Sequence, residues 1–160
     1  MAISYRPGRL VTWLFRAPSR LYDWRLGWLL GRRLCRITHV GRKSGRRYRT
    51  VVEVVGRDAV SGELMVVCGF GRRADWYRNL RANDAAAIEV GFRRFAAGWR
   101  ELDVDEAEPV MAAYERRNRL LVPLIRRILS RVLGWRYDGS LEARRKLLAE
   151  MPIIAFKPKG

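Results

Sequence analysis

Cysteine and histidine are scarce in this chain of 160 residues, which has two cysteines and one histidine. Cys35 and Cys68 lie far from each other and from His39, so the sequence contains neither a metal-ligand spacing nor a C-x-x-C redox pair. We therefore expect no metal site and two buried, free thiols in a reducing compartment. No carboxylate is near His39 in the sequence and no serine or cysteine elbow is evident, so no catalytic triad is predicted.

Long apolar runs are also missing. None approaches the roughly 20 residues of a membrane-spanning helix. The apolar stretches near the N-terminus are interrupted by Arg16, Arg20 and Arg25, unlike a secretory signal peptide, so a cytoplasmic location is expected. The hydrophobic fraction of 49% at this length predicts one compact domain with a real core.

Acidic residues are few, 16 against 33 basic residues, which gives a net charge of +17. All but four of the basic residues are arginines. So large an excess predicts an anionic partner: nucleic acid, an anionic membrane, or a cofactor that carries phosphate and carboxylate groups. Because a preference for arginine can also follow from genomic base composition, charge alone does not choose between these partners.

Two segments place glycines beside cations where a strand pattern ends: GRKSG at residues 41–45, and the glycine-bearing loop at 69–74. Glycine lets the backbone approach a ligand closely with its N–H groups free. Neither segment completes a nucleotide motif, because Lys43 lacks the glycines of a P-loop and no third glycine follows Gly71. If the two loops meet, they form an anion-binding cleft. Taken alone, each can be a solvated basic loop.

Hydrophobic periodicity predicts the secondary structure. A period of two indicates strands at 34–40, 48–55, 63–68, 86–90, 93–102 and 152–156, and their short connections favour antiparallel pairing. Helices are predicted at 75–80 with Asp75 as the N-cap, at 103–118 where Asp103 and Glu106 have capping-box spacing, and at 119–150 with a break at 134–139. The sum is an α+β fold, a small antiparallel barrel decorated with helices.

The N-terminal part differs from the rest of the chain. Residues 1–33 are expected to hold amphipathic helices, in which tryptophans alternate with arginines. Such helices can rest on an anionic membrane surface or pack against their own domain. Residues 34–160 are expected to form the barrel domain with a helical insertion at about 119–150, so that the whole chain makes one compact domain.

Three motifs in this order carry a resemblance to a known family. They are GRKSG followed by Arg49 and Thr50, DWYRN at 75–79 continuing to Asn83, and PIIAF at 152–156. The chain resembles the deazaflavin-dependent nitroreductase and quinone-reductase family, which uses coenzyme F(420). The resemblance covers roughly residues 34–118 and 150–158. It implies an FMN-binding split-barrel-like fold, with FMN itself a less expected cofactor. It also implies an oxidoreductase that transfers a hydride from reduced coenzyme to a quinone, nitro compound or activated alkene.

The same resemblance implies a site. The first turn would meet the phosphate and tail of the coenzyme, the second loop would add backbone and cationic contacts, and Trp76 and Asn79 would lie near the ring. The implied cofactor contacts are Arg42, Lys43, Ser44, Arg49, Thr50, Gly71, Arg72, Arg73, Ala74, Trp76 and Asn79. From the residues alone, Trp76 can equally fill the core and Asn79 can cap its helix.

Some positions depart from the family pattern. Tyr48 stands where many members have arginine, and Val51 where they have proline. The C-terminal tyrosine segment of the nitro-drug-reducing members is replaced by the helical residues 119–150. Tyr114 is the candidate catalytic tyrosine by position.

A function of another class is a non-enzymatic basic module on nucleic acid or an anionic membrane. Nucleic acid is the less expected partner, because aromatic residues are not interleaved with the basic turn. The apolar stripe at 120–133 is compatible with an enzyme that sits on the inner face of the membrane to meet a lipid-soluble quinone, and equally with a homodimer.

Overall fold

The computed structural model describes residues 32–160. The helices predicted in 1–33 therefore lie outside the described residues, except for Arg32 and Arg33, which form a turn. Within the described range, no helix is long and apolar enough to cross a membrane.

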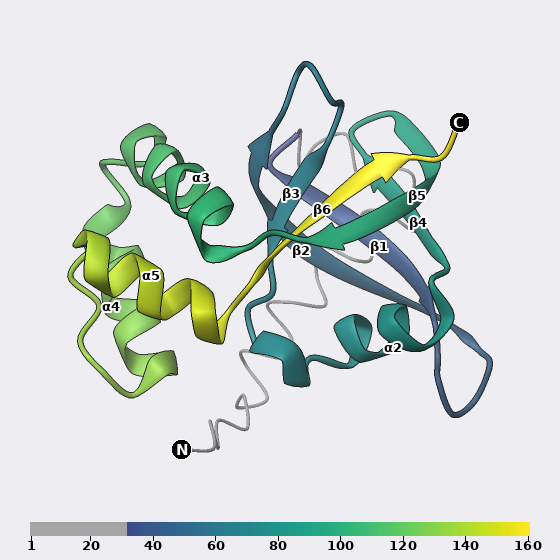
Figure 1. Ribbon diagram of the computed structural model, residues 1–160, viewed down its shortest axis with the longest axis horizontal. Coiled ribbons are helices and arrows are strands. Elements are labelled where there is room, and N and C mark those ends of the chain that lie inside the picture. Colours follow the sequence, from purple (N-terminus) through teal and green to yellow (C-terminus); the bar gives the residue numbers. More distant parts are fainter. Residues whose placement is uncertain (1–31) are drawn as a thin grey trace.

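Six strands close into an antiparallel barrel (Figure 1). They are β1 (Leu34–Val40), β2 (Arg47–Arg57), β3 (Leu64–Val67), β4 (Ala86–Val90), β5 (Arg93–Glu101) and β6 (Ile153–Pro158). Their order around the barrel is β1-β2-β3-β6-β5-β4, so the last strand of the chain closes the gap between β3 and β5. The small antiparallel barrel predicted from the period of two is confirmed.

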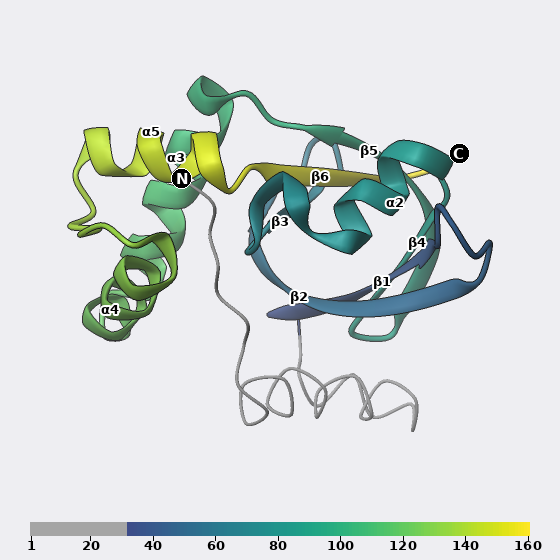
Figure 2. The same ribbon diagram turned by 90° about the horizontal axis from the view of Figure 1, so that it is seen from below.

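The barrel interior is filled from alternate positions of its strands, because successive side chains of a strand point to opposite faces. Cys35, Ile37, Val66, Ile88 and Phe156 are fully buried there. Helix α2 (Asp75–Asn83) adds three more buried side chains to the same core, Trp76, Tyr77 and Leu80. Figure 2 shows α2 lying across the barrel opposite β1 and β2. The helix therefore packs its buried side chains into the barrel core, which fixes its position relative to the β1–β2 hairpin.

Three helices form a lobe beside the barrel (Figures 1 and 2). They are α3 (Val104–Arg117), α4 (Val122–Leu133) and α5 (Leu141–Glu150). Met111, Leu147, Leu148 and Met151 make a second core against Ile153 of β6. The capping box predicted for α3 is present: Glu106 N–H donates to Asp103 Oδ1 at 2.8 Å, and Asp103 N–H donates to Glu106 Oε2 at 3.2 Å.

The start of α2 differs from the prediction. Asp75 is not the N-cap, because Ala74 holds that position in an extended conformation and Asp75 is the first helical residue. The Asp75 carboxylate instead accepts a hydrogen bond from Arg42 at 2.9 Å, and a negative charge in the first turn also suits the helix dipole. A short 3-10 helix, η2 (Gly71–Arg73), precedes it and was not predicted.

Candidate functional site

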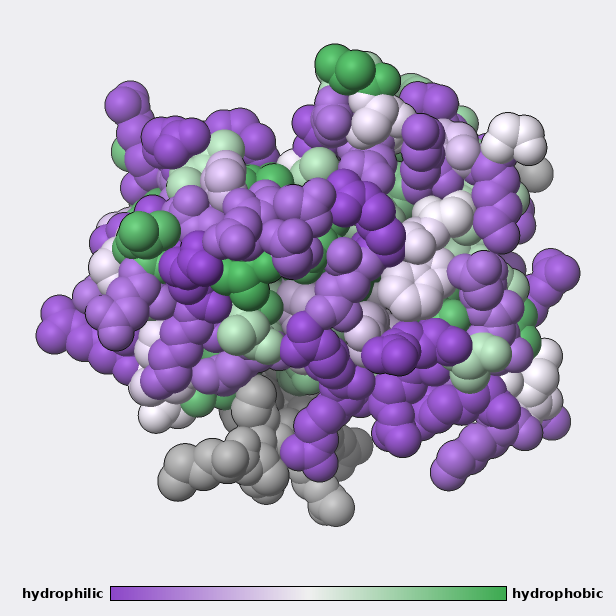
Figure 3. Space-filling model, viewed as in Figure 1, coloured by the Kyte–Doolittle hydropathy of each residue, from purple (hydrophilic) through white to green (hydrophobic). Residues whose placement is uncertain are grey.

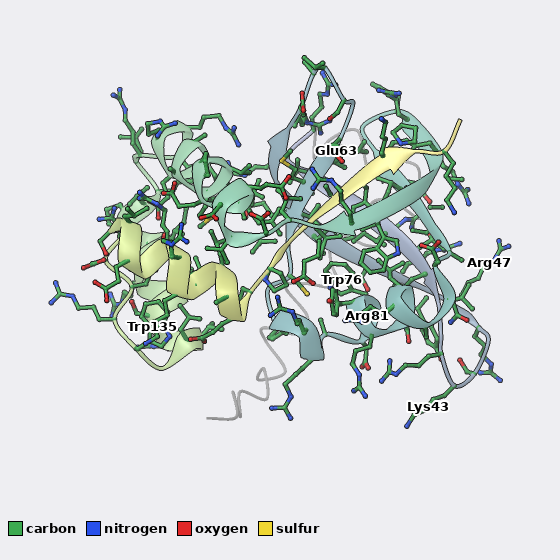
Figure 4. The ribbon with its side chains drawn as sticks, viewed as in Figure 1. Lys43, Arg47, Glu63, Trp76, Arg81 and Trp135 are labelled. Carbon is green, nitrogen blue, oxygen red and sulfur yellow. The ribbon has the colours of Figure 1, made fainter. Side chains whose placement is uncertain are left out.

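The turn between β1 and β2 presents a cluster of exposed cations. Lys43, Arg46, Arg47 and Arg49 are all exposed, and no acidic residue occurs between Gly41 and Val52. Figure 4 shows Lys43 and Arg47 projecting from this hairpin into solvent. The hairpin itself therefore carries several exposed positive charges and no carboxylate, and the neighbouring Asp75 is paired with Arg42.

The hairpin tip is held by its own contacts. The Ser44 and Tyr48 hydroxyl oxygens are 2.9 Å apart, and Arg46 N–H donates to Ser44 Oγ at 3.3 Å. A Cβ at Gly41 would lie 2.5 Å from the Tyr48 ring and 2.6 Å from Ser44 Oγ, so this packing requires glycine there. Ser44, a predicted cofactor contact, thus also shapes the turn.

Arg42 fastens the hairpin to α2. Its backbone N–H and its Nη1 both donate to Asn79 Oδ1, at 3.1 and 2.8 Å, while Nη2 donates to Asp75 Oδ1. At the other end of the helix, Asn83 Nδ2 donates to the Val40 carbonyl at 3.0 Å. The exposed cations are therefore carried on a turn that is anchored at both ends of one helix.

A buried chain of hydrogen bonds continues inward from Asn79. Because Asn79 Oδ1 accepts two bonds from Arg42, its Nδ2 faces His39 Nδ1 and donates to it at 3.0 Å. Burial lowers the pKa of His39, only partly offset by the Asp75 charge, and so keeps the imidazole neutral. Its single proton is then on Nε2, which donates to Thr50 Oγ1 at 3.1 Å. The Thr50 hydroxyl keeps its own hydrogen for another acceptor.

Sequence reasoning missed the role of His39. Its partners lie 11 and 40 residues away, on β2 and α2, and nothing in the local sequence connects them. The antiparallel register that places Tyr48 opposite His39 brings Thr50 within reach of the imidazole.

Arg49 and Thr50 belong to opposite faces of β2, although they are adjacent in the sequence. Side chains alternate along a strand, and Thr50 reaches the buried His39 while Glu53 reaches Tyr114 of α3 outside the barrel. Arg49 therefore shares the outer face with Glu53. A ligand that contacts both Arg49 and Thr50 has to reach around β2, either at its hairpin end or at the edge that is not paired with β3 before Val54.

The second loop is turned toward the helical lobe. Arg72 Nη1 donates to the Ala149 carbonyl at 2.8 Å, and its Nη2 pairs with Glu101, which also accepts from Tyr77 at 2.5 Å. Arg73 is exposed and Ala74 is buried as the N-cap of α2. The link between the two loops is the Arg42–Asp75 contact at the start of α2. Arg72, by contrast, is engaged with β5 and the end of α5.

The backbone conformation and the packing at Gly71 require glycine there. Its φ is +63°, and a Cβ there would collide with the carbonyl oxygen of Glu150. The loop thus passes close to the end of α5. Its contact with a cofactor stays a prediction.

Trp76 and Asn79 are both buried. The Trp76 ring packs edge-on against Tyr77, with centroids 6.3 Å apart, inside the barrel core. Of the two roles left open for Trp76, the structure shows core packing. Asn79 uses its amide on Arg42 and His39. A contact of either side chain with a cofactor ring stays a prediction.

Tyr114 lines a cleft of about 380 Å³ between β2 and α3. Its hydroxyl donates to Glu53 Oε1 at 2.9 Å, and Arg33 Nε donates to the same oxygen at 3.2 Å. Burial and then the Glu53 carboxylate raise the pKa of Tyr114 above its ordinary value, so the phenol keeps its proton.

The cleft is strongly positive. Its lining consists of Arg32, Arg33, Glu53, Val54, Gly56, Arg57, Tyr114, Arg117 and Asn118. Four arginines thus surround one carboxylate. Tyr114 was predicted by position alone, and the arginines around it come from three segments that only the fold brings together.

The two cysteines take no part in either site. Both are buried and free, and burial raises the pKa of Cys35 and of Cys68 to about 12. Among residues 32–160 no group of histidine, cysteine and acidic side chains is placed to hold a metal ion.

Comparison with known proteins gives a family and a fold. The model of the F(420)H(2)-dependent quinone reductase family matches residues 17–120. A search of curated proteins found no match.

Among solved structures, an F(420)-H2 dependent reductase, FDR-A, is 18% identical, with 79% of this chain and 95% of that chain covered and a TM-score of 0.46. A putative pyridoxamine 5'-phosphate oxidase from Listeria innocua has a TM-score of 0.51 at 11% identity, with 88% and 94% covered. A heme storage protein from Vibrio cholerae has a TM-score of 0.51 at 14% identity, with 88% and 91% covered. The two likenesses with a TM-score of 0.51 show the fold alone, and they confirm the split barrel.

Proposed function

This chain belongs to the F(420)H(2)-dependent quinone reductase family, and we propose that its β1–β2 hairpin holds the anionic tail of the cofactor while a quinone is reduced beside Tyr114. Membership makes the chain a deazaflavin-dependent oxidoreductase with coenzyme F(420) as its cofactor. When bound, the reduced coenzyme supplies the hydride. The protein has to bind it, orient it and manage protons.

The observation that carries the proposal is the anchored cationic hairpin. A phosphate with a glutamate tail bears several negative charges, and exposed Lys43, Arg46 and Arg47 offer charge-assisted hydrogen bonds on a turn that has no carboxylate of its own. Because Arg42 binds Asn79 and Asp75, the turn is ordered before the ligand arrives, which lowers the entropic cost of binding. The donor set of the hairpin thus fits the charged part of the coenzyme.

Thr50 extends this binding surface. His39 Nε2–H occupies one lone pair of the Thr50 oxygen, so the hydroxyl hydrogen is available to an oxygen of the cofactor. Asn79 and His39 act as positioning residues, since they set the direction in which Thr50 donates.

The cleft at Tyr114 suits the acceptor. A quinone oxygen gains negative charge as the hydride arrives, and Arg33, Arg57 and Arg117 stand close enough to line the same cleft. The Tyr114 hydroxyl, which donates a hydrogen bond to Glu53 in the structure, can turn to donate its proton to that oxygen. Nitro compounds and activated alkenes develop charge in the same way and remain candidate acceptors.

Cofactor binding is tested by titration with oxidised coenzyme, followed by deazaflavin fluorescence. Lys43→Ala should weaken binding roughly fivefold, because the loss of one exposed charge-assisted hydrogen bond typically lowers the affinity by about that factor. Lys157→Ala is the matched control, an exposed lysine on β6 across the barrel, and should leave the affinity unchanged. No saturable binding of the wild-type chain at micromolar protein would contradict the proposal.

The acceptor site is tested with reduced coenzyme and a water-soluble quinone. Tyr114→Phe should bind the coenzyme normally and turn over roughly a hundredfold more slowly, because a positioned proton donor is lost. Tyr137→Phe is the matched control: its hydroxyl donates to Glu115 at 2.5 Å in the same lobe but outside the cleft. Equal turnover of wild type and Tyr114→Phe would remove Tyr114 from the mechanism.

A further inference from the structure

Helix α4 carries apolar side chains on two faces. Ile125, Leu129, Val132 and Leu133 pack into the core of the helical lobe. A second set remains exposed in the turn before α4 and on its first two turns: Leu120 at 87%, Leu121 at 42%, Leu124 at 57% and Ile128 at 53%. Scattered exposed leucines are ordinary, but four within nine residues make a contiguous apolar ridge. The face of the molecule in Figure 3 is largely hydrophilic.

The apolar ridge lies in a segment whose charged residues are all basic. Residues 116–137 contain seven arginines and no acidic residue. Arg127 and Arg131 lie one helical turn from Leu124 and Ile128, so they flank the ridge on the same side of α4. Apolar and cationic side chains thus share one exposed surface.

A cleft of about 330 Å³ adjoins this ridge between α3 and α4. Its charged lining is Glu115, Arg116, Arg119, Arg126 and Arg144, one carboxylate against four guanidinium groups. Glu115 already accepts from Tyr137 and lies 3.5 Å from Arg144 and 4.0 Å from Arg126. Arg126 Nε is buried without a hydrogen-bond partner in the described part of the chain. The cleft therefore has unused capacity to bind an anion.

We propose that α4 docks this protein on an anionic membrane surface. The ridge of Leu120, Leu121, Leu124 and Ile128 enters the boundary between headgroups and acyl chains, and the arginines beside it meet lipid phosphates. Juxtamembrane arginines are attracted to an anionic leaflet, which adds to the apolar contribution.

An anionic membrane surface complements the charge of α4 better than a second copy of the chain does. A symmetric dimer through α4 brings the same patch of both copies together, so the arginines of the two copies would gather with no carboxylate of residues 116–137 between them. An anionic bilayer instead supplies phosphates to the arginines and an apolar layer to the leucines. If the proposed function also holds, this orientation brings the Tyr114 cleft, which likewise borders the end of α3, near lipid-soluble quinones.

Vesicle co-sedimentation of the full chain at physiological salt tests the docking surface. We expect binding to vesicles of phosphatidylcholine and phosphatidylglycerol, and little binding to phosphatidylcholine alone. Leu124→Ser with Ile128→Ser should weaken binding roughly tenfold, because two apolar anchors are lost. Both side chains are exposed, so the fold should survive, which circular dichroism checks. Val60→Ser, at the exposed β2–β3 turn, is the control and should bind like wild type.

A second pair of variants separates charge from apolar contact. Arg127→Glu with Arg131→Glu should abolish binding to the anionic vesicles, whereas Arg46→Glu with Arg47→Glu on the hairpin should retain most of it. Equal binding of wild type and both α4 variants would overturn the proposal. So would a wild-type dimer in sedimentation velocity that the Leu124/Ile128 variant converts to monomer without lipid, since the ridge would then be an interface between copies.

Discussion

At the scale of the residue, His39 links the packing of the barrel to a measurable pH dependence. Burial lowers its folded-state pKa from the ordinary 6.5. As the pH falls below that value, the unfolded chain takes up a proton that the folded protein does not. The free energy of unfolding therefore decreases with falling pH, from the unfolded pKa down to the lowered folded one.

We expect wild-type protein to lose more stability between about pH 7 and 5 than His39→Gln does, because only the wild type has this imidazole. Urea unfolding of both proteins across that range measures the difference. Carboxylates titrate equally in the two proteins and cancel. Parallel curves would mean that the pKa of His39 is not lowered in the folded protein, which would contradict the neutral imidazole assigned to His39 over this pH range.

The two cysteines give a second residue-scale prediction. Burial raises their pKa to about 12, so near pH 8 neither should be a thiolate in the folded protein. A chromogenic disulfide reagent should label native protein very slowly, and should label both thiols at once in guanidinium. Rapid labelling of one thiol in native protein would show an opening that the buried positions of Cys35 and Cys68 do not provide.

At the scale of the element, the loop before α2 depends on one glycine. Gly71→Ala places a side chain at positive φ and against the Glu150 carbonyl, and should destabilise the protein by about 1–3 kcal/mol. Gly69→Ala is the matched control two residues earlier, where a Cβ would meet nothing within 4 Å. Thermal unfolding of the two variants compares them. A similar melting temperature for both would show that the loop moves away from α5 at little cost.

Periodicity was enough to predict the strands and the α-helices of residues 32–160, because each buries one face against a core. It was not enough for the start of α2. Asp75 has the sequence of an N-cap, but its carboxylate pairs with Arg42, 33 residues away, and the chain enters the helix through an extended Ala74. The place of β6 between β3 and β5 likewise depends on which strand edges remain unpaired in the folded barrel.

At the scale of the whole molecule, sequence motifs located the cationic β1–β2 turn, whose contact with a cofactor stays a prediction. The cationic turn is local, so GRKSG and the arginines after it could be read directly. The hydrogen bonds of His39 and the arginine-lined cleft at Tyr114 could not be predicted in this way. Asn79, Arg57 and Arg117 reach their partners only when the barrel closes. Arg49 and Thr50 are adjacent in the sequence and were predicted to contact the same part of the cofactor. Because side chains alternate along β2, they lie on opposite faces of the strand.

The positive charge of the molecule makes cofactor affinity dependent on salt. The hairpin cations are exposed, and salt screens exposed charges over roughly 10 Å at 0.1 M. The affinity for the coenzyme should fall roughly tenfold between about 0.05 and 0.5 M salt, and less steeply for Lys43→Ala. Fluorescence titration at several salt concentrations measures both slopes. An affinity that does not change with salt would place the anionic tail away from the hairpin.

Cofactor binding at the hairpin is tested most directly by steady-state oxidation of reduced coenzyme F(420) by a quinone, with wild type and a Lys43→Ala/Arg46→Ala variant compared at varied coenzyme. We expect quinone-dependent turnover in both, with KM for the coenzyme raised at least tenfold in the variant and kcat little changed, because the proposed hairpin contact is to a part of the cofactor remote from the reacting ring. Absence of quinone-dependent turnover in the wild type, or the same KM in both proteins, would contradict the proposed function.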